Sequence, residues 1–241
     1  PDYLLTHPSV LQELALHCQR EGIQLPSLSE VRTISESLPD GLRVLCYEVW
    51  GVKLIDMYST IELGYLALQC PEHEHYHVQL ESVLLEVLDD DGNPCVPGQI
   101  GKVVVTNLHN FATPLIRYEL GDFAEVGEPC LCGRGLPVIK RVLGRYRNLI
   151  TLPNGERCWP KFGLGEMLKI APVLQYQAIQ HSIKEVEFLL VMERSLSHED
   201  KQKLLELFSS NLHPEMNITV REVDSIQRSA SGKYEEFMSK L

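Results

Sequence analysis

The sequence predicts an α/β segment, then a β-rich region, and finally a small, separate α+β domain with the order β-β-α-β. Three observations support this prediction. Two amphipathic helical patterns and a short β-like run occupy residues 7–56. β-Branched residues then dominate from Gln79 onward. After Gly144, two strand-like runs, a capped helix and another strand-like run follow in that order. We therefore expect an α/β plus α+β fold.

The first predicted helix covers residues 7–21. Thr6 can cap it, Pro8 suits its first turn, and Gly22 follows its end. Apolar residues recur between these limits at helical spacing. They are Val10, Leu11, Leu14, Ala15 and Cys18.

A second helix is predicted from about Asp40 to Trp50, because Leu42, Leu45, Cys46 and Val49 share one helical face. Gly51 can end this helix in a left-handed conformation. The run VKLID follows at once and is typical of a strand. This step from helix to strand favours α/β architecture.

The β-rich region contains two runs, SVLLEVLD at residues 82–89 and GKVVVTNL at residues 101–108. Both are rich in β-branched residues, and the turn-forming segment DDDGNP lies between them. The pattern predicts a pair of half-buried strands arranged like a hairpin.

The small domain is predicted from four successive patterns. Ser197 is the expected N-cap of its helix, with Asp200 at the third helical position. The strand, strand, helix and strand are expected at VLQYQAIQHS, EVEFLLVME, SHEDKQKLLELFSSNL and NITVREVDSI.

Composition narrows the functional classes. The 241 residues have 44% hydrophobic content, and 22 basic against 33 acidic residues give a net charge of −11. Binding to nucleic acid or to an anionic membrane surface is not expected, because both need basic surfaces. The first residues lack a signal peptide, and no apolar run reaches the roughly 20 residues of a membrane helix. A cytoplasmic protein with small-molecule or protein partners is expected.

Four short sequence stretches, taken in their order along the chain, indicate the function. They are DMYSTIELG at 56–64, PLIRYELGDFAEV at 114–126, GRYRNLITLPNG at 144–155 and RSASGKYEEF at 228–237. Together they resemble the adenylate-forming superfamily of acyl-CoA synthetases, peptide-synthetase adenylation domains and luciferases. The resemblance is strongest to phenylacetate-coenzyme A ligases and to capsular-polysaccharide and coenzyme F390 synthetase relatives. It covers nearly the whole chain.

The resemblance implies a domain division and a reaction. Residues 1–146 would be the carboxy-terminal portion of the large adenylation domain, and residues 147–241 the small mobile domain. In such ligases a carboxylate attacks the α-phosphorus of ATP, and the acyl adenylate then passes to coenzyme A. Lys233 matches the mobile catalytic lysine, and Arg147 the hinge between the domains. Without the resemblance, Lys233 would be read as a solvated surface charge.

The first stretch supplies three expected site residues. Glu62 matches a carboxylate that helps to hold Mg²⁺, and Tyr58 matches a ring that stacks on adenine, with Ser59 beside it. The alternatives are a helix-start glutamate and a core tyrosine. Ser59 stands where the motif has glycine, and Ile61 replaces a hydroxyl residue that would contact phosphate. The replacement at Ile61 weakens the expectation of full ATP-site competence.

Further nucleotide contacts are implied by shorter matches. Asp122 matches the carboxylate that accepts hydrogen bonds from both ribose hydroxyls, and Arg145 matches an arginine on the ribose or phosphates. A simple Gly-Asp turn is the alternative reading of Asp122. Ser35, Glu36 and Ser37 match the turn that lines the adenine face.

A second group of residues predicts structural zinc. Three histidines alternate after Cys70, which would place all three on one face of a strand. Two cysteines separated by one residue occur much later, and a Cys3His set could hold Zn²⁺ tetrahedrally. The alternative is a solvated histidine-rich loop with reduced thiols. The predicted ligands are Cys70, His77, Cys130 and Cys132, with His75 and His73 as alternatives to His77.

The sequence lacks the Ser/Thr/Gly-rich loop that would cradle the β- and γ-phosphates. An upstream segment of the same protein is therefore an expected partner, together with a carboxylic acid, ATP and coenzyme A, and a homodimer is possible. Two other readings stay open. One is a non-catalytic, zinc-stapled nucleotide-binding remnant, and the other is adenylation with transfer to a carrier protein or an amine. The identity of the acid cannot be read from the sequence.

Overall fold

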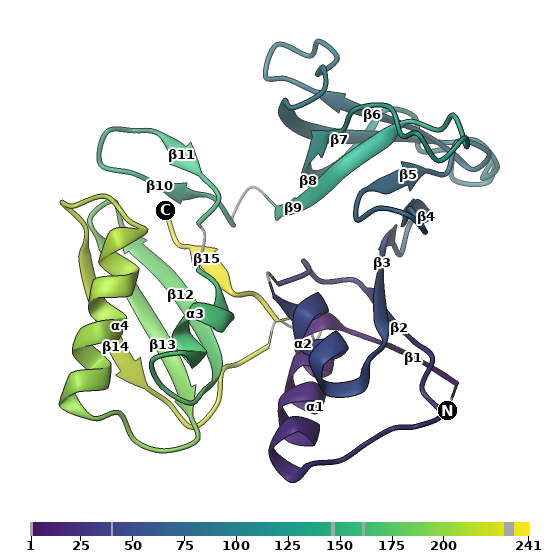
Figure 1. Ribbon diagram of the computed structural model, residues 1–241. Helices are drawn as coiled ribbons and strands as arrows, with labels where there is room; N and C mark the ends of the chain where they lie inside the picture. Colours follow the sequence, from purple (N-terminus) through teal and green to yellow (C-terminus); the bar gives the residue numbers. More distant parts are fainter. Residues whose placement is uncertain (1, 40, 146–147, 161, 229–233) are drawn as a thin grey trace. The chain divides into compact units, whose positions relative to one another are not determined.

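The computed structural model describes residues 2–39, 41–145, 148–160, 162–228 and 234–241. Its contacts divide the chain into two compact units. Residues 1–8, 26–37 and 52–146 form the first, here called the sheet unit. Residues 9–25, 38–51 and 147–241 form the second, here called the α+β unit. Figure 1 shows the elements of both units.

The sheet unit contains one nine-stranded sheet with the order β1-β2-β3-β4-β5-β9-β8-β7-β6. β1, β2 and β3 pair in parallel, and all later neighbours pair antiparallel. The strands are β1 (Tyr3–Thr6), β2 (Glu30–Ile34), β3 (Lys53–Thr60), β4 (Gly64–Gln69), β5 (Tyr76–Val78), β6 (Val83–Leu88), β7 (Ile100–Asn107), β8 (Tyr118–Val126) and β9 (Val138–Arg145).

The expected pair of strands in the β-rich region is confirmed as β6 and β7, which run antiparallel with Val83 opposite Asn107. Their inward-facing residues Val83, Val103 and Val105 are fully buried in the core of this unit. The turn between them is fixed by Asp89, whose carboxylate accepts hydrogen bonds from the backbone amides of Asp91 and Asn93. The strand predicted at VKLID is longer than expected, because β3 continues through Tyr58 to Thr60.

The two predicted helices near the amino terminus are present as α1 (Pro8–Glu21) and α2 (Leu42–Trp50). Gly51 ends α2 with φ 68°, and its amide donates to the Tyr47 carbonyl. A left-handed glycine that closes the last turn is the expected C-cap. Among the described residues, no helix is long and apolar enough to cross a membrane.

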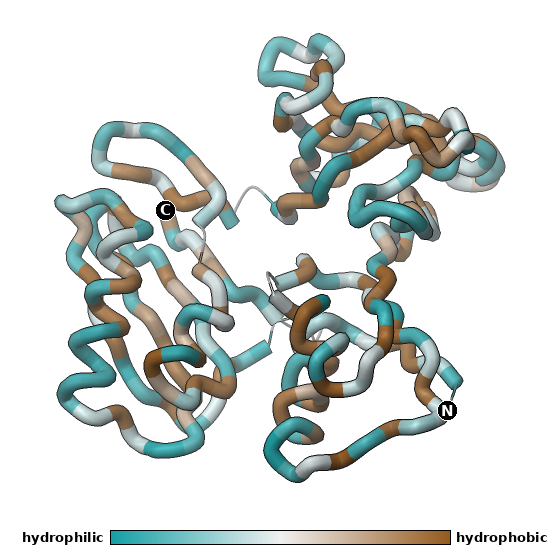
Figure 2. Tube along the Cα trace, viewed as in Figure 1, coloured by the Kyte–Doolittle hydropathy of each residue, from teal (hydrophilic) through white to brown (hydrophobic). Residues whose placement is uncertain are grey.

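The α+β unit has a four-stranded sheet with the order β14-β13-β12-β15. The predicted β-β-α-β order is confirmed by β12 (Val173–Ser182), β13 (Glu185–Met192), α4 (His198–Ser210) and β14 (Asn217–Glu222). Phe188 and Phe208 stack with ring centroids 3.7 Å apart, and the Phe162 ring packs edge-on against Phe188. Figure 2 shows the apolar residues of these strands and of α4. These rings form the centre of the core of this unit.

Several elements carry weak sequence signals and are seen only in the structure. α3 (Leu164–Leu168) is a single short helix, and β10 (Ile150–Thr151) pairs with β11 (Arg157–Cys158). β15 (Phe237–Ser239) adds to the edge of the small sheet in parallel with β12. Short parallel pairings of this kind depend on distant partners, so no local pattern predicts them.

Candidate functional site

Three strands of the sheet unit bring together three residues that the sequence had selected separately. Tyr58 lies on β3, Asp122 on β8 and Arg145 on β9. The Tyr58 hydroxyl donates to Oδ2 of Asp122 at 2.8 Å, and Nε of Arg145 lies 3.7 Å from Oδ1 of the same carboxylate. Asp122 and Arg145 are also direct cross-strand partners. We call Tyr58, Asp122 and Arg145 the carboxylate triad.

Burial and charge define the chemistry of this triad. Burial raises the pKa of Tyr58 above its ordinary value, and the neighbouring Asp122 carboxylate raises it further. Tyr58 therefore stays a neutral hydrogen-bond donor. The Asp122 side chain is 15% exposed, whereas that of Arg145 is 57% exposed. A carboxylate has about four acceptor positions, so Asp122 can accept more hydrogen bonds from a ligand.

The other expected nucleotide-site residues lie near strand ends of the same sheet. Ser35, Glu36 and Ser37 directly follow β2, and Ser35 has φ 74°, which marks a tight change of direction there. Ser59 is the last residue but one of β3, at a β-bulge that begins after Tyr58. The structure therefore places these residues in turns or at irregular backbone, the kind of element on which binding residues are often found.

Glu62 lies in the turn between β3 and β4, and its side chain is exposed. The Leu63 amide donates to Oγ1 of Thr60 at 3.1 Å and holds this turn in shape. Ile61 is 98% exposed. Lys233 and Arg147, the expected catalytic lysine and hinge, lie outside the described residues.

Sulfur and imidazole groups converge at a second place in the sheet unit. One potential ligand atom from each of Cys70, His75, His77 and Cys130 lies within 4.8 Å of the others. Sγ of Cys70 is 3.9 Å from Sγ of Cys130, and Sγ of Cys132 is 3.3 Å from Nε2 of His77. The sequence had selected four of these five residues as ligands. The fifth residue, His75, was predicted as an alternative to His77, and the structure brings both histidines to this place. We call these five residues the Cys/His cluster.

The donor set of the Cys/His cluster fits Zn²⁺. Nε2 of His75 is buried and has no hydrogen-bond partner, and a metal ion would satisfy such an atom. Burial and the neighbouring imidazoles lower the pKa of His75 and keep it neutral, as metal ligation requires. Hydrogen bonds from Arg134 lower the pKa of Cys132 to about 6, whereas desolvation raises the pKa of Cys130 to about 11.

The expected strand through all three histidines is wrong. Only His77 lies on a strand, β5, while His73 and His75 belong to the loop between β4 and β5. Pro71 has no backbone N–H to donate to a strand ladder, and the loop closes instead with the Cys70 amide donating to the His75 carbonyl at 2.8 Å. The His73 and His75 rings stack with centroids 5.1 Å apart.

A buried polar network next to this loop was missed from the sequence. The Asp56 carboxylate on β3 is almost fully buried and accepts from the Thr33 hydroxyl at 2.5 Å and from the Tyr76 hydroxyl at 2.6 Å. The Asp56 amide donates to the side chain of Gln69 at 2.8 Å. One signal was available, since an aspartate inside an otherwise apolar strand needs buried partners.

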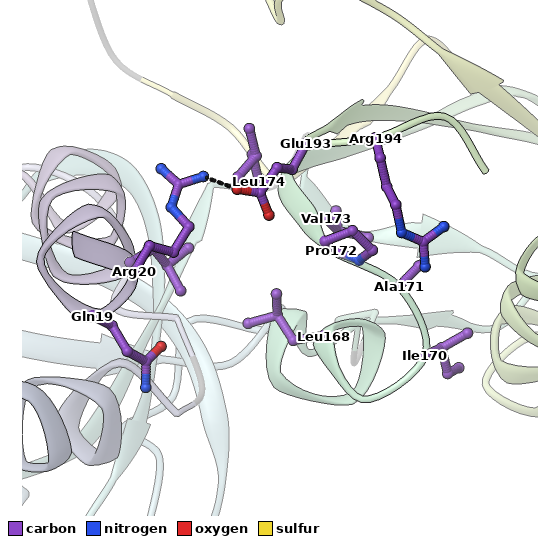
Figure 3. A pocket seen from close by; sticks show the side chains of 11 residues that line it. Gln19, Arg20, Leu168, Ile170, Ala171, Pro172, Val173, Leu174, Glu193 and Arg194 are labelled. Carbon is purple, nitrogen blue, oxygen red and sulfur yellow. Dashed lines mark hydrogen bonds and ion pairs between the residues drawn. The ribbon is translucent and has the colours of Figure 1, made fainter. Parts of the chain in front are cut away.

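A hollow of about 590 Å³ lies within the α+β unit and is shown in Figure 3. Its wall includes Leu168 and Ile170, and its charged side chains are Arg20, Glu193 and Arg194. Arg20 pairs with Glu193 at 2.9 Å, and Arg194 pairs with Asp200 at 3.0 Å. Both cations are thus already neutralised, and no motif from the sequence maps to this hollow.

The chain is similar to one protein-family model and to two named enzymes. Residues 163–240 match the family model of the CapK C-terminal domain. The phenylacetate-coenzyme A ligase of Thermus thermophilus is 27% identical over 216 residues, which cover 85% of this chain and 48% of the relative. The enzyme of the same name from Pseudomonas putida is 27% identical over 185 residues, which cover 70% of this chain and 39% of the relative. The chain thus spans half or less of the length of these relatives.

Solved structures give the same result for the fold. A 2-hydroxyisobutyryl-CoA ligase in complex with 2-HIB-AMP aligns with a TM-score of 0.78 at 18% identity, covering 100% of this chain and 55% of that protein. An anthranilate CoA ligase in complex with anthranoyl-AMP aligns with a TM-score of 0.71 at 19% identity, covering 97% and 48%. The predicted resemblance is confirmed, because the chain matches the carboxy-terminal part of adenylate-forming ligases.

Proposed function

From this match to the carboxy-terminal part of adenylate-forming ligases, we propose that the chain is the corresponding part of an ATP-dependent, AMP-forming acid–thiol ligase. The whole protein would activate a carboxylic acid as its acyl or aryl adenylate and pass it to coenzyme A. The carboxylate triad is the observation that carries the proposal. Three residues selected from separate motifs meet on three strands, and the Tyr58 hydroxyl lies 2.8 Å from Asp122.

The proposed roles follow from the chemistry of these groups. Asp122 accepts hydrogen bonds from the two ribose hydroxyls, because a carboxylate can accept from two adjacent donors at once. Arg145, which is largely exposed, contacts the ribose or the phosphates through its planar set of donors. Ser35, Glu36, Ser37, Tyr58 and Ser59 line the base.

Two further residues would counter the negative charge on the phosphoryl groups, one through a metal ion and one directly. Glu62 helps to hold Mg²⁺, for which a carboxylate together with phosphate oxygens is a suitable ligand set. Lys233 stabilises the negative charge that builds on the phosphoryl oxygens during adenylation. Arg147 is the proposed hinge. Its role rests on the family's domain rotation between adenylation and thioester formation.

The test is pyrophosphate exchange by the full-length protein with ATP and a panel of aromatic and aliphatic acids. Exchange that depends on one of the acids is expected. Asp122→Asn should weaken AMP binding roughly tenfold or more, because an amide group cannot accept at both atoms. Glu119→Gln removes an exposed charge from the same strand and is the matched control. No exchange with any acid, or equal effects of the two variants, would contradict the proposal.

We also propose that the Cys/His cluster holds a structural Zn²⁺ ion. The unpartnered buried Nε2 of His75 and the close sulfur atoms support this site. Such a site would join the loop after β4 to residues 130–132, which lie far away in the sequence. Zn²⁺ would take four of these five residues as ligands. A closed set of four leaves no position for substrate, so the ion would stabilise the fold and take no part in chemistry.

Metal analysis checks the zinc proposal. The protein purified without chelator should contain about one equivalent of zinc. Cys70→Ser should lose most of it, whereas Cys158→Ser, an exposed cysteine of the α+β unit, should retain it. A metal content below about a tenth of an equivalent in the unaltered protein would refute the site, since tight binding is expected.

One observation favours a second function, a zinc-stapled nucleotide-binding remnant without catalysis. Ile61 is 98% exposed at the position where the family motif has a phosphate-contacting hydroxyl. AMP or MgATP binding by calorimetry, without exchange for any acid, would support this reading. Ile61→Thr offers a direct comparison, because restoring the hydroxyl should then raise the affinity for MgATP more than that for AMP.

The acceptor and the location are the last parts of the proposal. Coenzyme A is the acceptor that the similar ligases are named for, while a carrier protein or an amine is the alternative. Thioester formation from a preformed adenylate, followed by mass spectrometry with each acceptor, separates them. A cytoplasmic location is proposed on the seven cysteines, none of which forms a disulfide in the described part of the chain.

A further inference from the structure

We propose that Asp56 is a positioning residue that couples the Cys/His cluster to the carboxylate triad. The inference rests on the proposed function, because it concerns the nucleotide and zinc sites assigned there. Asp56 itself belongs to neither site. Its carboxylate is 7% exposed and occupies the centre of the buried network on β2, β3, β4 and β5.

Asp56 contacts both ends of the metal-binding loop. Gln69 is the last residue of β4, and Tyr76 is the first residue of β5, so residues 70–75 form the loop between them. The Asp56 amide donates to the Gln69 side chain at 2.8 Å, and the Tyr76 hydroxyl donates to the Asp56 carboxylate at 2.6 Å. Any change in the spacing of the two loop ends therefore acts on Asp56.

Gln69 extends the connection into the loop itself. Its side-chain amide donates to the His73 carbonyl at 3.4 Å while its oxygen accepts from the Asp56 amide. Gln69 and Tyr76 are also direct cross-strand partners. The neighbours of these two residues in sequence are Cys70, His75 and His77, three members of the Cys/His cluster. Metal binding thus fixes residues that are adjacent to the network.

On the other side, Asp56 lies two residues before Tyr58 on the same strand. Residues two apart on a strand face the same side of a sheet, so Asp56 and Tyr58 share one face of β3. Tyr58 in turn donates to Asp122. A shift of Asp56 along or across β3 changes the position of the Tyr58 hydroxyl and, through it, the orientation of the carboxylate that is proposed to bind ribose.

Thr33 provides a matched control within the same network. Its hydroxyl donates to the other oxygen of Asp56 at 2.5 Å. Thr33 is fully buried, and Tyr76 is nearly so. Thr33 lies on β2 and is not attached to the metal-binding loop. Thr33→Val and Tyr76→Phe each remove one hydroxyl donor from Asp56, but only Tyr76→Phe removes a contact with the loop, and the contact through Gln69 remains.

The experiment measures the coupling between two ligands, Zn²⁺ and AMP, on the full-length protein. Zinc affinity is measured by competition with a chromogenic chelator, with and without saturating AMP. Coupling between sites is reciprocal, so AMP should tighten zinc binding if zinc organises the triad. We expect roughly a fivefold or larger tightening in the unaltered protein and in Thr33→Val, and a smaller factor in Tyr76→Phe, which keeps only the contact through Gln69.

A second measurement needs no removal of metal. Hydrogen exchange of the zinc-loaded proteins should show that AMP slows exchange at residues 70–77 in the unaltered protein and in Thr33→Val, and slows it less in Tyr76→Phe. AMP binding without any effect on zinc affinity or on this exchange would overturn the coupling and leave the proposed nucleotide site standing. Equal coupling in the two variants would overturn the role of Asp56. Failure of AMP to bind would overturn both proposals.

Discussion

The two units of this protein use buried polar groups in different ways. In the sheet unit, the described buried residues include the ionisable side chains Asp56, His77 and Glu125. In the α+β unit, the buried polar side chains of the described residues are uncharged and include Gln177 and Gln180. Burying a charge is costly unless it is paired, so such groups concentrate where function or a bound ion repays the cost. The sheet unit thus buries ionisable groups beside its apolar core, whereas the described part of the α+β unit buries uncharged polar groups beside its own.

Gln180 shows how the α+β unit satisfies a buried polar group without charge. Its side-chain oxygen accepts from the Thr151 amide at 3.0 Å, and its side-chain nitrogen donates to the Thr151 carbonyl at 2.7 Å. The side chain thus pairs with β10 as another strand would. Glu125 in the sheet unit accepts instead from two cations, Lys140 at 2.7 Å and Arg141 at 2.6 Å.

The largest expected effect is on the core of the α+β unit. Phe188→Ala removes the ring stacked on Phe208 and should lower the free energy of unfolding by about 3–5 kcal/mol in urea denaturation. Ile183→Ala, at an exposed position of the same unit, should change it by less than about 0.5 kcal/mol. AMP affinity should change little in either variant. If Phe188→Ala lowered AMP affinity as much as it lowered the free energy of unfolding, the proposed division between a binding unit and a structural unit would be contradicted.

An intermediate effect is expected for the buried charge in the sheet unit. Hydrogen bonds from Lys140 and Arg141 hold the pKa of Glu125 below its ordinary value of 4.5. This interaction stabilises the fold above that pH and is lost as the pH falls through the lowered pKa. Glu125→Gln should cost about 1–3 kcal/mol at neutral pH, where urea unfolding is measured. The difference from the unaltered protein should shrink on acidification, and a difference that grows would contradict the assignment.

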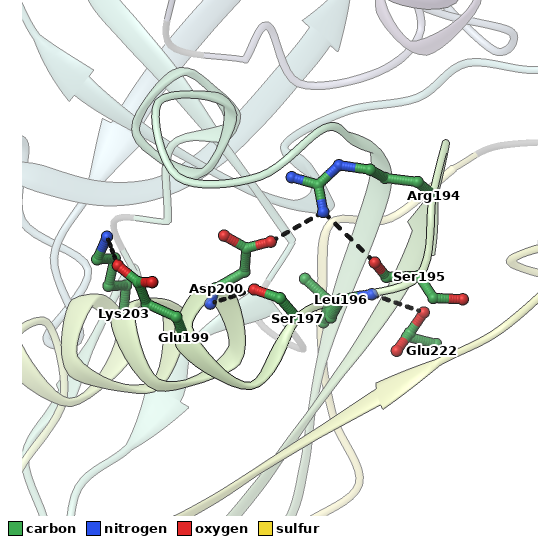
Figure 4. A network of polar contacts seen from close by, with 8 residues as sticks. All are labelled: Arg194, Ser195, Leu196, Ser197, Glu199, Asp200, Lys203 and Glu222. Carbon is green, nitrogen blue, oxygen red and sulfur yellow. Dashed lines mark hydrogen bonds and ion pairs between the residues drawn. The ribbon is translucent and has the colours of Figure 1, made fainter.

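The smallest effect is expected at the surface network of α4, shown in Figure 4. The Ser197 hydroxyl accepts from the Asp200 amide at 3.0 Å, and Arg194 pairs with the Asp200 carboxylate at 3.0 Å. Ser197→Ala should lower stability by about 1 kcal/mol, because one amide at the helix start loses its acceptor. Ser195→Ala is the neighbouring control and should be neutral. Equal unfolding midpoints for the two variants would contradict the role of the cap.

Local sequence patterns predicted the helices and strands that have regular apolar spacing, capping residues or many β-branched residues. α1, α2 and α4 follow from apolar spacing and from caps such as Gly51 and Ser197. The strands β6 and β7 follow from their β-branched residues. The individual members of the carboxylate triad came from separate motifs. That Tyr58 donates to Asp122 could not be predicted, because the two residues are 64 positions apart and meet only through strand pairing.

The sequence by itself indicated which residues are expected to carry chemistry, since its motifs resemble those of adenylate-forming ligases at Tyr58, Asp122 and Arg145, and its cysteines and histidines form two groups typical of metal ligands. Only the tertiary structure decided which of these side chains touch. It placed His75 beside His77, where the sequence had named His75 only as an alternative, and it moved His73 and His75 from a strand into a loop. It also revealed the buried network around Asp56. The physical reason is that buried polar groups choose partners across strands, at distances in sequence that no local pattern records.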